Sequence, residues 1–253
     1  MLTVAAWRAP FEPSTLSRFE VAADVHAGPG EILLVRLGNG GNGMSRGVDM
    51  HEIPGLVREL RKRHPGCPVA LWIPDAPPQH VIDAVRSAGQ AQVRAILGGD
   101  ALEPALLRAQ LTHPMGLSAF ILRWASDAGY LPEGMEHDDV RELIDAAPDV
   151  RTLERLSTLR NVAARTWRSR LQHLGLPTPR AWLGLAHALH VAFFVQRNHT
   201  DSVQTLCEKL GMHNVAHMSQ QFRRVFGLSP SQVRDRLGAE PLLHRWFQAR
   251  SPR

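Results

Sequence analysis

Cysteine is scarce in this 253-residue chain, and long apolar runs are missing. Its two cysteines, Cys67 and Cys207, lie far apart and cannot build a disulfide framework, so we expect two free thiols. No window approaches the ~18 uncharged apolar residues that a membrane span needs. The N-terminal residues lack the basic region and apolar core of a signal peptide. These absences predict a cytoplasmic protein without a membrane partner.

Negative charge is sparse in the second part of the chain. Residues 150–253 hold 16 Lys and Arg against 5 Asp and Glu, a net charge of +11. Residues 1–149 hold 13 against 19, a net charge of −6. A segregated basic segment is typical of nucleic-acid binding. A membrane surface would also attract it, but no lipidation motif or membrane-type amphipathic helix accompanies it.

The first ~110 residues alternate short apolar runs with helical patterns, which predicts an α/β domain over residues 1–111. Several runs are continuously apolar, as buried parallel strands are. The expected strands are Leu2–Trp7, Phe19–Val25, Ile32–Leu37, Val69–Ile73 and Val93–Leu97. The expected helices are Ile53–Arg63, Val81–Ser87 and Leu102–Leu111. This order predicts a five-stranded, doubly wound parallel sheet.

Strand patterns end after the α/β domain. We expect a linker over 112–137 with one possible helix, Leu117–Ser126, an all-helical domain over 138–240 and a tail over 241–253. The helices expected in the last domain are Asp138–Ala146, Thr152–Asn161, Ala164–Leu174, Pro179–Gln196, Ser202–Leu210, Val215–Phe226 and Pro230–Leu237. Thr178–Pro179 and Ser229–Pro230 each place a capping hydroxyl before a proline at the first helical position.

Two helix pairs recur in this domain, TLERLSTLRN–VA–ARTWRSRLQHLG and SVQTLCEKLG–MH–NVAHMSQQFRRVFG. In the first pair, Trp167, Leu171 and Leu174 are expected to face inward, and basic residues outward. The same spacing in the second pair predicts an inward face of Val203, Leu206, Leu210, Val215, Met218, Phe222 and Phe226. Its outward face carries Asn214, His217, Gln220, Gln221 and Arg224. The pattern indicates two helix-turn-helix units whose Arg, Asn and Gln side chains suit base edges in the DNA major groove.

The segment LGMHNVAHMSQQFRRVFGLSPSQVR (210–234), preceded by LQHLGLPTPRAWLGLAHAL (171–189), resembles the AraC/XylS family of bacterial transcription regulators. The resemblance covers about Asp138–Leu237 and implies two helix-turn-helix units joined by a linker helix, Pro179–Gln196. It implies base-facing positions at Arg165, Arg168, Ser169, Val215, Ala216 and Gln220. We add their neighbours Arg170, Asn214, His217, Arg223 and Arg224 as DNA-contact candidates.

The sequence departs from the family at three positions. Ala163 stands where the family often has a serine, Met218 where it often has an aromatic residue, and Gln220 where it often has arginine. Val215 and Ala216 can make only apolar contacts, for example with a thymine methyl group. We therefore expect weaker base readout from the second unit.

The N-terminal order of strands and helices resembles a response-regulator receiver domain in pattern only. The positions where a receiver needs acids, a phospho-acceptor, a hydroxyl and a lysine hold Ala6, Arg36, Ile73 and Gly98. Without clustered carboxylates no Mg²⁺ site is expected. We therefore predict a receiver-like domain without phosphotransfer, which serves in dimerisation or in sensing a partner or effector.

A glycine-rich loop offers an enzyme-like alternative. Gly38–Gly43 fits the dinucleotide-binding pattern G-x-G-x-x-G after a strand, but four residues separate its last glycine from the segment that leads to the next helix. A flexible surface turn is the interpretation we prefer. No local nucleophile signature is found, so we predict neither an enzyme nor a cofactor.

Histidine pairs offer a second alternative, a metal site. His187 and His190, and His213 and His217, have chelating spacing, but no Cys, Asp or Glu completes either set locally. No metal is predicted. The sequence thus favours a transcription regulator that binds double-stranded DNA, with homodimerisation through the N-terminal domain as an option. The alternatives are a small-molecule- or nucleotide-sensing domain, or an enzyme domain, fused to a helical bundle that binds DNA or protein.

Overall fold

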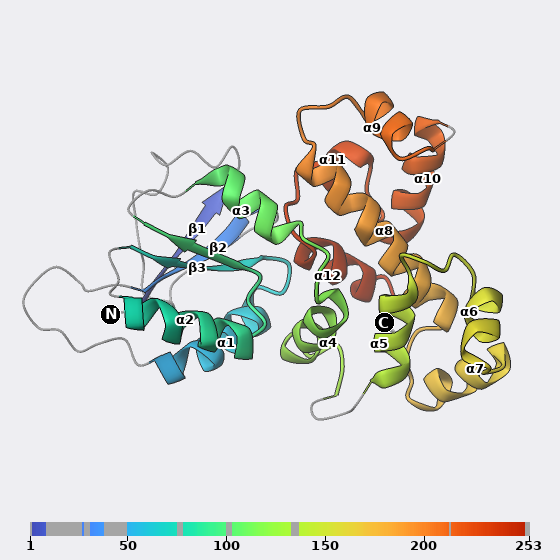
Figure 1. Cartoon of the computed structure of the whole chain (residues 1–253), viewed down its shortest axis with the longest axis horizontal. Helices are drawn as coiled ribbons and strands as arrows, with labels where there is room; N and C mark the ends of the chain where they lie inside the picture. Colours follow the sequence, from blue (N-terminus) through green and yellow to red (C-terminus); the bar gives the residue numbers. More distant parts are fainter. Residues whose placement is uncertain are drawn as a thin grey trace, which may run out of the picture.

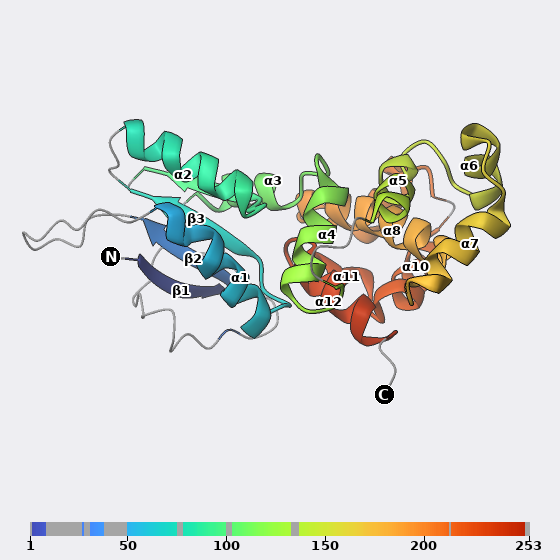
Figure 2. The ribbon, with the colours of Figure 1, turned by 90° about the horizontal axis from the view of Figure 1, so that it is seen from below.

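The computed structural model describes residues 2–8, 27, 31–37, 50–74, 78–99, 103–132, 137–212 and 214–250. Figure 1 shows an α/β domain beside a helical domain, and Figure 2 shows the same two parts from below. The expected strand Phe19–Val25, the loop Gly38–Gly43 and His213 lie outside the described residues. No helix within the described ranges has the length and apolar character needed to span a bilayer.

The described strands form one sheet in the order β1 (Leu2–Arg8), β2 (Glu31–Leu37), β3 (Val69–Ile73) and β4 (Ala95–Gly98). Strands β2, β3 and β4 are parallel, but β1 runs antiparallel to β2. The expectation of an all-parallel doubly wound sheet is therefore wrong for β1. The apolar pattern of a buried strand reports its burial and not its direction, so the sequence could not distinguish the two arrangements.

Helices cover both faces of the sheet. On one face, α1 (Ile53–Arg63) and α2 (Pro78–Gln90) pack against alternate β2 and β3 residues, and a 3₁₀ turn, Met50–Glu52, precedes α1. On the other face, Leu107 and Leu111 of α3 (Pro104–Leu111) pack against the intervening residues. The layers thus agree with the expectation of an α/β domain covered on both sides.

The four positions that correspond to a receiver's functional residues do not gather at one place. Arg36, Ile73 and Gly98 lie near the carboxyl ends of β2, β3 and β4. Ala6 lies opposite Leu33, in the first half of β2, because β1 is antiparallel. The prediction that all four positions share one edge of the sheet, as in a receiver, is therefore wrong for Ala6. The lack of phosphotransfer stays a prediction.

The helical domain surrounds one long helix, α8 (Pro179–Arg197), in a continuous apolar core. Figure 1 shows α6 and α7 near one end of α8 and α9 and α10 near the other. The helices around α8 are α4 (Leu117–Asp127), α5 (Asp138–Ala146), α6 (Leu153–Arg160), α7 (Ala164–His173), α9 (Val203–Lys209), α10 (Val215–Phe226), α11 (Pro230–Arg234) and α12 (Glu240–Gln248).

Two of these helices lie in segments that we expected to be a linker and a tail. Helix α4, from the expected linker, buries Phe120 and Trp124 in the helical core. Helix α12, from the expected tail, buries Trp246, whose ring centroid lies 4.8 Å from that of Trp182 on α8. A tail at 241–253 is therefore wrong for residues 241–248. Apolar pairs at helical spacing, such as Leu242–Leu243 and Trp246–Phe247, indicate a buried helix in this segment.

A buried ion pair joins the two domains. The guanidinium of Arg61 on α1 lies 2.7 Å from a carboxylate oxygen of Asp127 at the end of α4, and both side chains are buried. Burial lowers the pKa of Arg61, although the hydrogen bond that it donates to Asp127 opposes this shift. Arg61 also donates to the backbone oxygens of Ala91 and Gln92, at 2.9 and 3.0 Å. Because the buried Arg61 guanidinium hydrogen-bonds to both domains, it fixes one domain against the other.

Candidate DNA-binding surface

Helices α6 and α7 form the first of the two expected helix-turn-helix units. The hydroxyl of Thr152 accepts a hydrogen bond from the Arg155 amide at 3.3 Å and caps α6. Asn161 ends α6 with φ of 52°, in the left-handed region that asparagine tolerates better than most residues. Helix α7 begins at Ala164, after a turn of three residues.

Helices α9 and α10 form the second unit. The Ser202 hydroxyl accepts from the Thr205 amide at 3.1 Å and caps α9. Gly211, with φ of +62°, turns the chain after α9. The side-chain oxygen of Asn214 accepts from the His217 amide at 2.9 Å, which caps α10.

The two turns share one hydrogen-bond pattern. The Val162 amide donates to the oxygen of Ser157 at 3.1 Å, and the Met212 amide donates to the oxygen of Cys207 at 2.9 Å. In each case the donor follows a residue in the left-handed conformation, as in a Schellman-type helix end. The duplication seen in the sequence is therefore also a duplication of backbone geometry.

The apolar faces of α7 and α10 are buried, as expected. Trp167 and Leu171 of α7 are almost fully buried, and so are Met218 and Phe222 of α10. Leu174, which we expected to face inward, is 38% exposed because it lies one residue beyond the end of α7. Burial of one face turns the opposite face of each helix to solvent.

The opposite faces carry the predicted contact residues. All of these residues are exposed except Val215, which is half-buried and packs against the helical core. The exposed contact candidates are Arg165, Arg168, Ser169 and Arg170 on α7, the α10 cap Asn214, and Ala216, His217, Gln220, Arg223 and Arg224 on α10.

Two of these candidates also have structural partners. A guanidinium nitrogen of Arg170 lies 3.1 Å from a carboxylate oxygen of Asp139 on α5. The side-chain oxygen of Asn214 is used as the α10 cap. The structure therefore gives Arg170 and Asn214 a role in orienting the two helices.

The exposed faces of α7 and α10 carry arginines and no acidic residue. Neither α7 nor α10 contains an acidic residue. The guanidinium groups of Arg165, Arg168, Arg223 and Arg224 make no hydrogen bond or ion pair with another described residue. These four cations are available to an anionic partner.

Helix α8 is held by polar contacts that the sequence did not single out. The buried Gln196 amide donates to the backbone oxygen of Val233 at 3.2 Å and accepts from the Gly238 amide at 3.1 Å, which ties α8 to the segments around α11. One ring nitrogen of His187 lies within 2.9 Å of the backbone oxygens of Ala147 and Val150. A lone amide in an apolar helix is the kind of signal that could have marked Gln196.

Both histidines of the pair on α8, His187 and His190, are partly buried. The pKa of His190 is lowered by burial and, to a smaller extent, by neighbouring His187. Within the part of the chain that the structure describes, no group of three or more His, Cys, Asp or Glu is placed to hold a metal ion.

Comparison with known proteins identifies the same part of the chain. Residues 156–236 match the family described as helix-turn-helix domain, of the AraC type. This segment runs from α6 to the end of α11 and so contains both turns and α8. Neither the search of curated proteins nor the search of solved structures gave a significant match. We conclude that residues 156–236 form an AraC-type helix-turn-helix domain, which supports a role in sequence-specific DNA binding and transcription regulation.

Proposed function

We propose that α7 and α10 are the two recognition helices and enter neighbouring major grooves of one DNA site. The observation that carries this proposal is the repeated turn, which is followed in both units by a helix with a buried apolar face and an exposed face free of acids. Helix α8 would set the spacing of the two helices, because major grooves on one side of DNA recur about every 34 Å.

The contact residues divide into two roles in this proposal. Arg165, Arg168 and Ser169 read bases from α7, while Ala216 and Gln220 do so from α10. Arginine suits guanine, glutamine suits adenine, and an alanine methyl group can contact thymine. Arg223 and Arg224, near the end of α10, would hold phosphates by charge.

The α/β domain would act in dimerisation or in sensing a partner or effector. Its support is a direct connection to the linker helix. Arg108 of α3 donates to the backbone oxygen of Gln196 at 2.8 Å, and Arg197 of α8 donates to the oxygen of Thr112 at 2.9 Å. A change of shape in the α/β domain would therefore reach the helix that joins the two units.

Selection of bound fragments from random DNA tests the DNA-binding proposal. We expect one enriched site with two half-sites about one helical turn apart. The logarithm of the affinity for that site should fall linearly with the logarithm of the salt concentration, by roughly 0.9 for each phosphate neutralised. Absence of an enriched site, or an affinity indifferent to salt, would contradict the proposal.

A further inference from the structure

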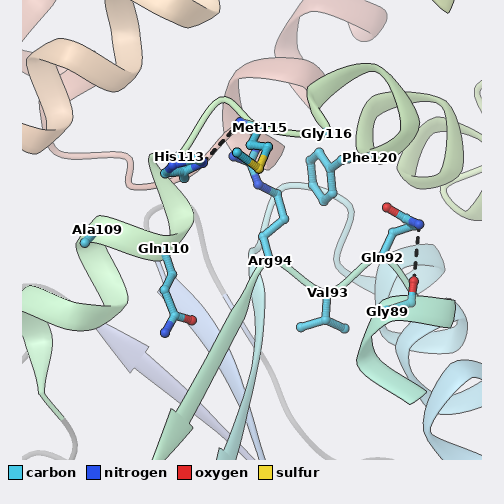
Figure 3. Close-up of a pocket in the computed structure, with 10 residues that line it drawn as sticks. All are labelled: Gly89, Gln92, Val93, Arg94, Ala109, Gln110, His113, Met115, Gly116 and Phe120. Carbon is cyan, nitrogen blue, oxygen red and sulfur yellow. Dashed lines mark hydrogen bonds between the residues drawn. The ribbon is translucent and has the colours of Figure 1, made fainter. Parts of the chain in front are cut away.

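An open cleft of about 490 Å³ lies where the α/β domain meets α4. Its walls come from the end of α2, the loop before β4, α3 and the beginning of α4 (Figure 3). Sites for small molecules typically measure about 300–1,000 Å³ and tend to occur between domains. The cleft has the size and the position of such a site.

Arg94 supplies the charge of the cleft. Its guanidinium carbon lies 5.0 Å from the ring centroid of Phe120 on α4 and 5.1 Å from that of Phe193 on α8. Both terminal nitrogens are screened from solvent and have no hydrogen-bond partner among the described residues. The two rings accept the positive charge weakly through their faces, but they leave the N–H groups unsatisfied.

The acid that acts electrostatically on Arg94 does not pair with it in the described structure. Glu240 on α12 acts on Arg94 electrostatically, yet no hydrogen bond or ion pair joins the two in the described structure. Glu240 is itself buried, and burial raises the pKa of its carboxyl group, which makes it a poor counterion. Arg61 shows the contrast, because its partner Asp127 lies within hydrogen-bond distance.

The other groups in the cleft narrow the chemistry of a ligand. The Gln110 side chain is occupied, since its oxygen accepts from the Ile96 amide and its nitrogen donates to the Ile96 oxygen. His113 uses one ring nitrogen to accept from the Met115 amide at 3.2 Å. The Gln92 side-chain nitrogen donates to the Gly89 oxygen at 3.2 Å. Among the described lining residues, Arg94 is the charged group without a hydrogen-bond partner, and it lies beside Val93 and the almost fully buried ring of Phe120.

We propose that this cleft binds a small organic anion, a carboxylate or phosphate monoester that carries a planar apolar group. The anionic group would accept hydrogen bonds from Arg94 once its screened guanidinium turns into the cleft, and the planar group would lie against the Phe120 face that the guanidinium leaves. Met115 also lines the cleft (Figure 3) and is 81% exposed, so its side chain can turn aside for a ligand.

The site would connect ligand binding to the linker helix. Phe193, which covers one face of the Arg94 guanidinium, belongs to α8. An anion that reoriented Arg94 would therefore alter a contact of the helix between the two helix-turn-helix units. This consequence rests on the function proposed above, whereas binding of the anion does not.

Calorimetry and thermal unfolding of the full chain, without DNA, test the site. The probes are phenyl phosphate and benzoate, with inorganic phosphate and neutral benzyl alcohol as comparisons. We expect saturable binding of at least one aromatic anion, a rise of roughly 5 °C in its unfolding midpoint at ~100 times the dissociation constant, and no binding of benzyl alcohol. The preference between the two aromatic anions distinguishes a phosphate ligand from a carboxylate ligand.

Three variants locate the binding. Arg94→Gln should weaken binding of the aromatic anion by about tenfold or more, because it removes the positive charge. Ala109→Trp should fill the cleft from an exposed position of α3 and block binding while Arg94 stays intact. Arg86→Gln, an arginine of α2 whose side chain is 69% exposed, is the matched control and should bind like the wild type.

The proposal is overturned if neither aromatic anion binds, if benzyl alcohol binds as well as they do, or if both Arg94→Gln and Ala109→Trp bind like the wild type. Since no DNA is present, these outcomes are independent of whether α7 and α10 read DNA. A chain that binds the anion but selects no DNA site would disprove the proposed function alone.

Discussion

Helices α7 and α10 follow equivalent turns but present different side chains to solvent. Helix α7 exposes Arg165, Arg168 and Ser169, and its N-cap residue, Ala163, has no capping side chain. Helix α10 exposes Ala216, His217 and Gln220 over its first two turns, and the side chain of Asn214 caps its beginning. The repeat therefore preserves the scaffold, while the chemistry of the exposed face is free to differ. The first unit is the cationic one at the positions expected to read bases.

The cores beneath the two helices also differ. Trp167 under α7 and Phe222 under α10 are both fully buried. The indole N–H of Trp167 has no hydrogen-bond partner among the described residues, whereas Phe222 has no polar atom to satisfy. The first unit thus gains a larger buried surface and carries an unpaired polar group.

The largest expected effect is on stability. Trp167→Ala and Phe222→Ala should each lower the free energy of unfolding by about 3–5 kcal/mol, because each leaves a large cavity. Trp167→Phe should lower the free energy of unfolding clearly less, because it leaves a smaller cavity and also removes the unpaired N–H group. Urea unfolding measures all three. Equal losses for Trp167→Phe and Trp167→Ala would show that the indole nitrogen has a partner.

A smaller effect is expected on DNA affinity. Arg165→Ala and Arg168→Ala should each cost about 1–3 kcal/mol against the selected site and relax its sequence preference. Gln220→Ala should cost less, because the second unit offers fewer base-reading groups. Affinity for the site and for single-base variants gives both quantities, with Arg86→Ala as a control distant from the helices.

Two results would contradict the prediction that α7 contributes more to base recognition than α10. Wild-type binding by both arginine variants would remove α7 from base recognition. A loss for Gln220→Ala greater than for either arginine variant would make α10 the dominant reader.

Local signals explain why many of the helices could be predicted. The bounds of α1, α5 and α10 agree with the sequence prediction, because amphipathic spacing and end signals are encoded within each helix. The turns were predictable for the same reason, since Asn161 and Gly211 are residue types that accept a left-handed conformation. The family match supports the same pairing of helices.

Long-range contacts explain what could not be predicted. The direction of β1 depends on the partner strand rather than on its own residues. The surroundings of Arg94 come from α4, α8 and α12, which are distant in sequence. Arg61 was within reach of prediction, because it occupies an apolar-face position four residues after Val57 on α1.

The smallest expected effect concerns the helix caps. Ala163 has φ of −61° and ψ of 140°, the extended conformation of a capping residue, yet it offers no side-chain acceptor. Ala163→Ser should stabilise the chain by about 0.5–1 kcal/mol by accepting from the Thr166 amide, and Asn214→Ala should destabilise it by about 1 kcal/mol. Unfolding midpoints of the two variants measure both changes, and Ala163→Gly controls for backbone effects. If Ala163→Ser gave no gain while Asn214→Ala gave its full loss, the start of α7 would be fixed by Trp167 packing alone. The two units would then differ in how their recognition helices are held as well as in what those helices present.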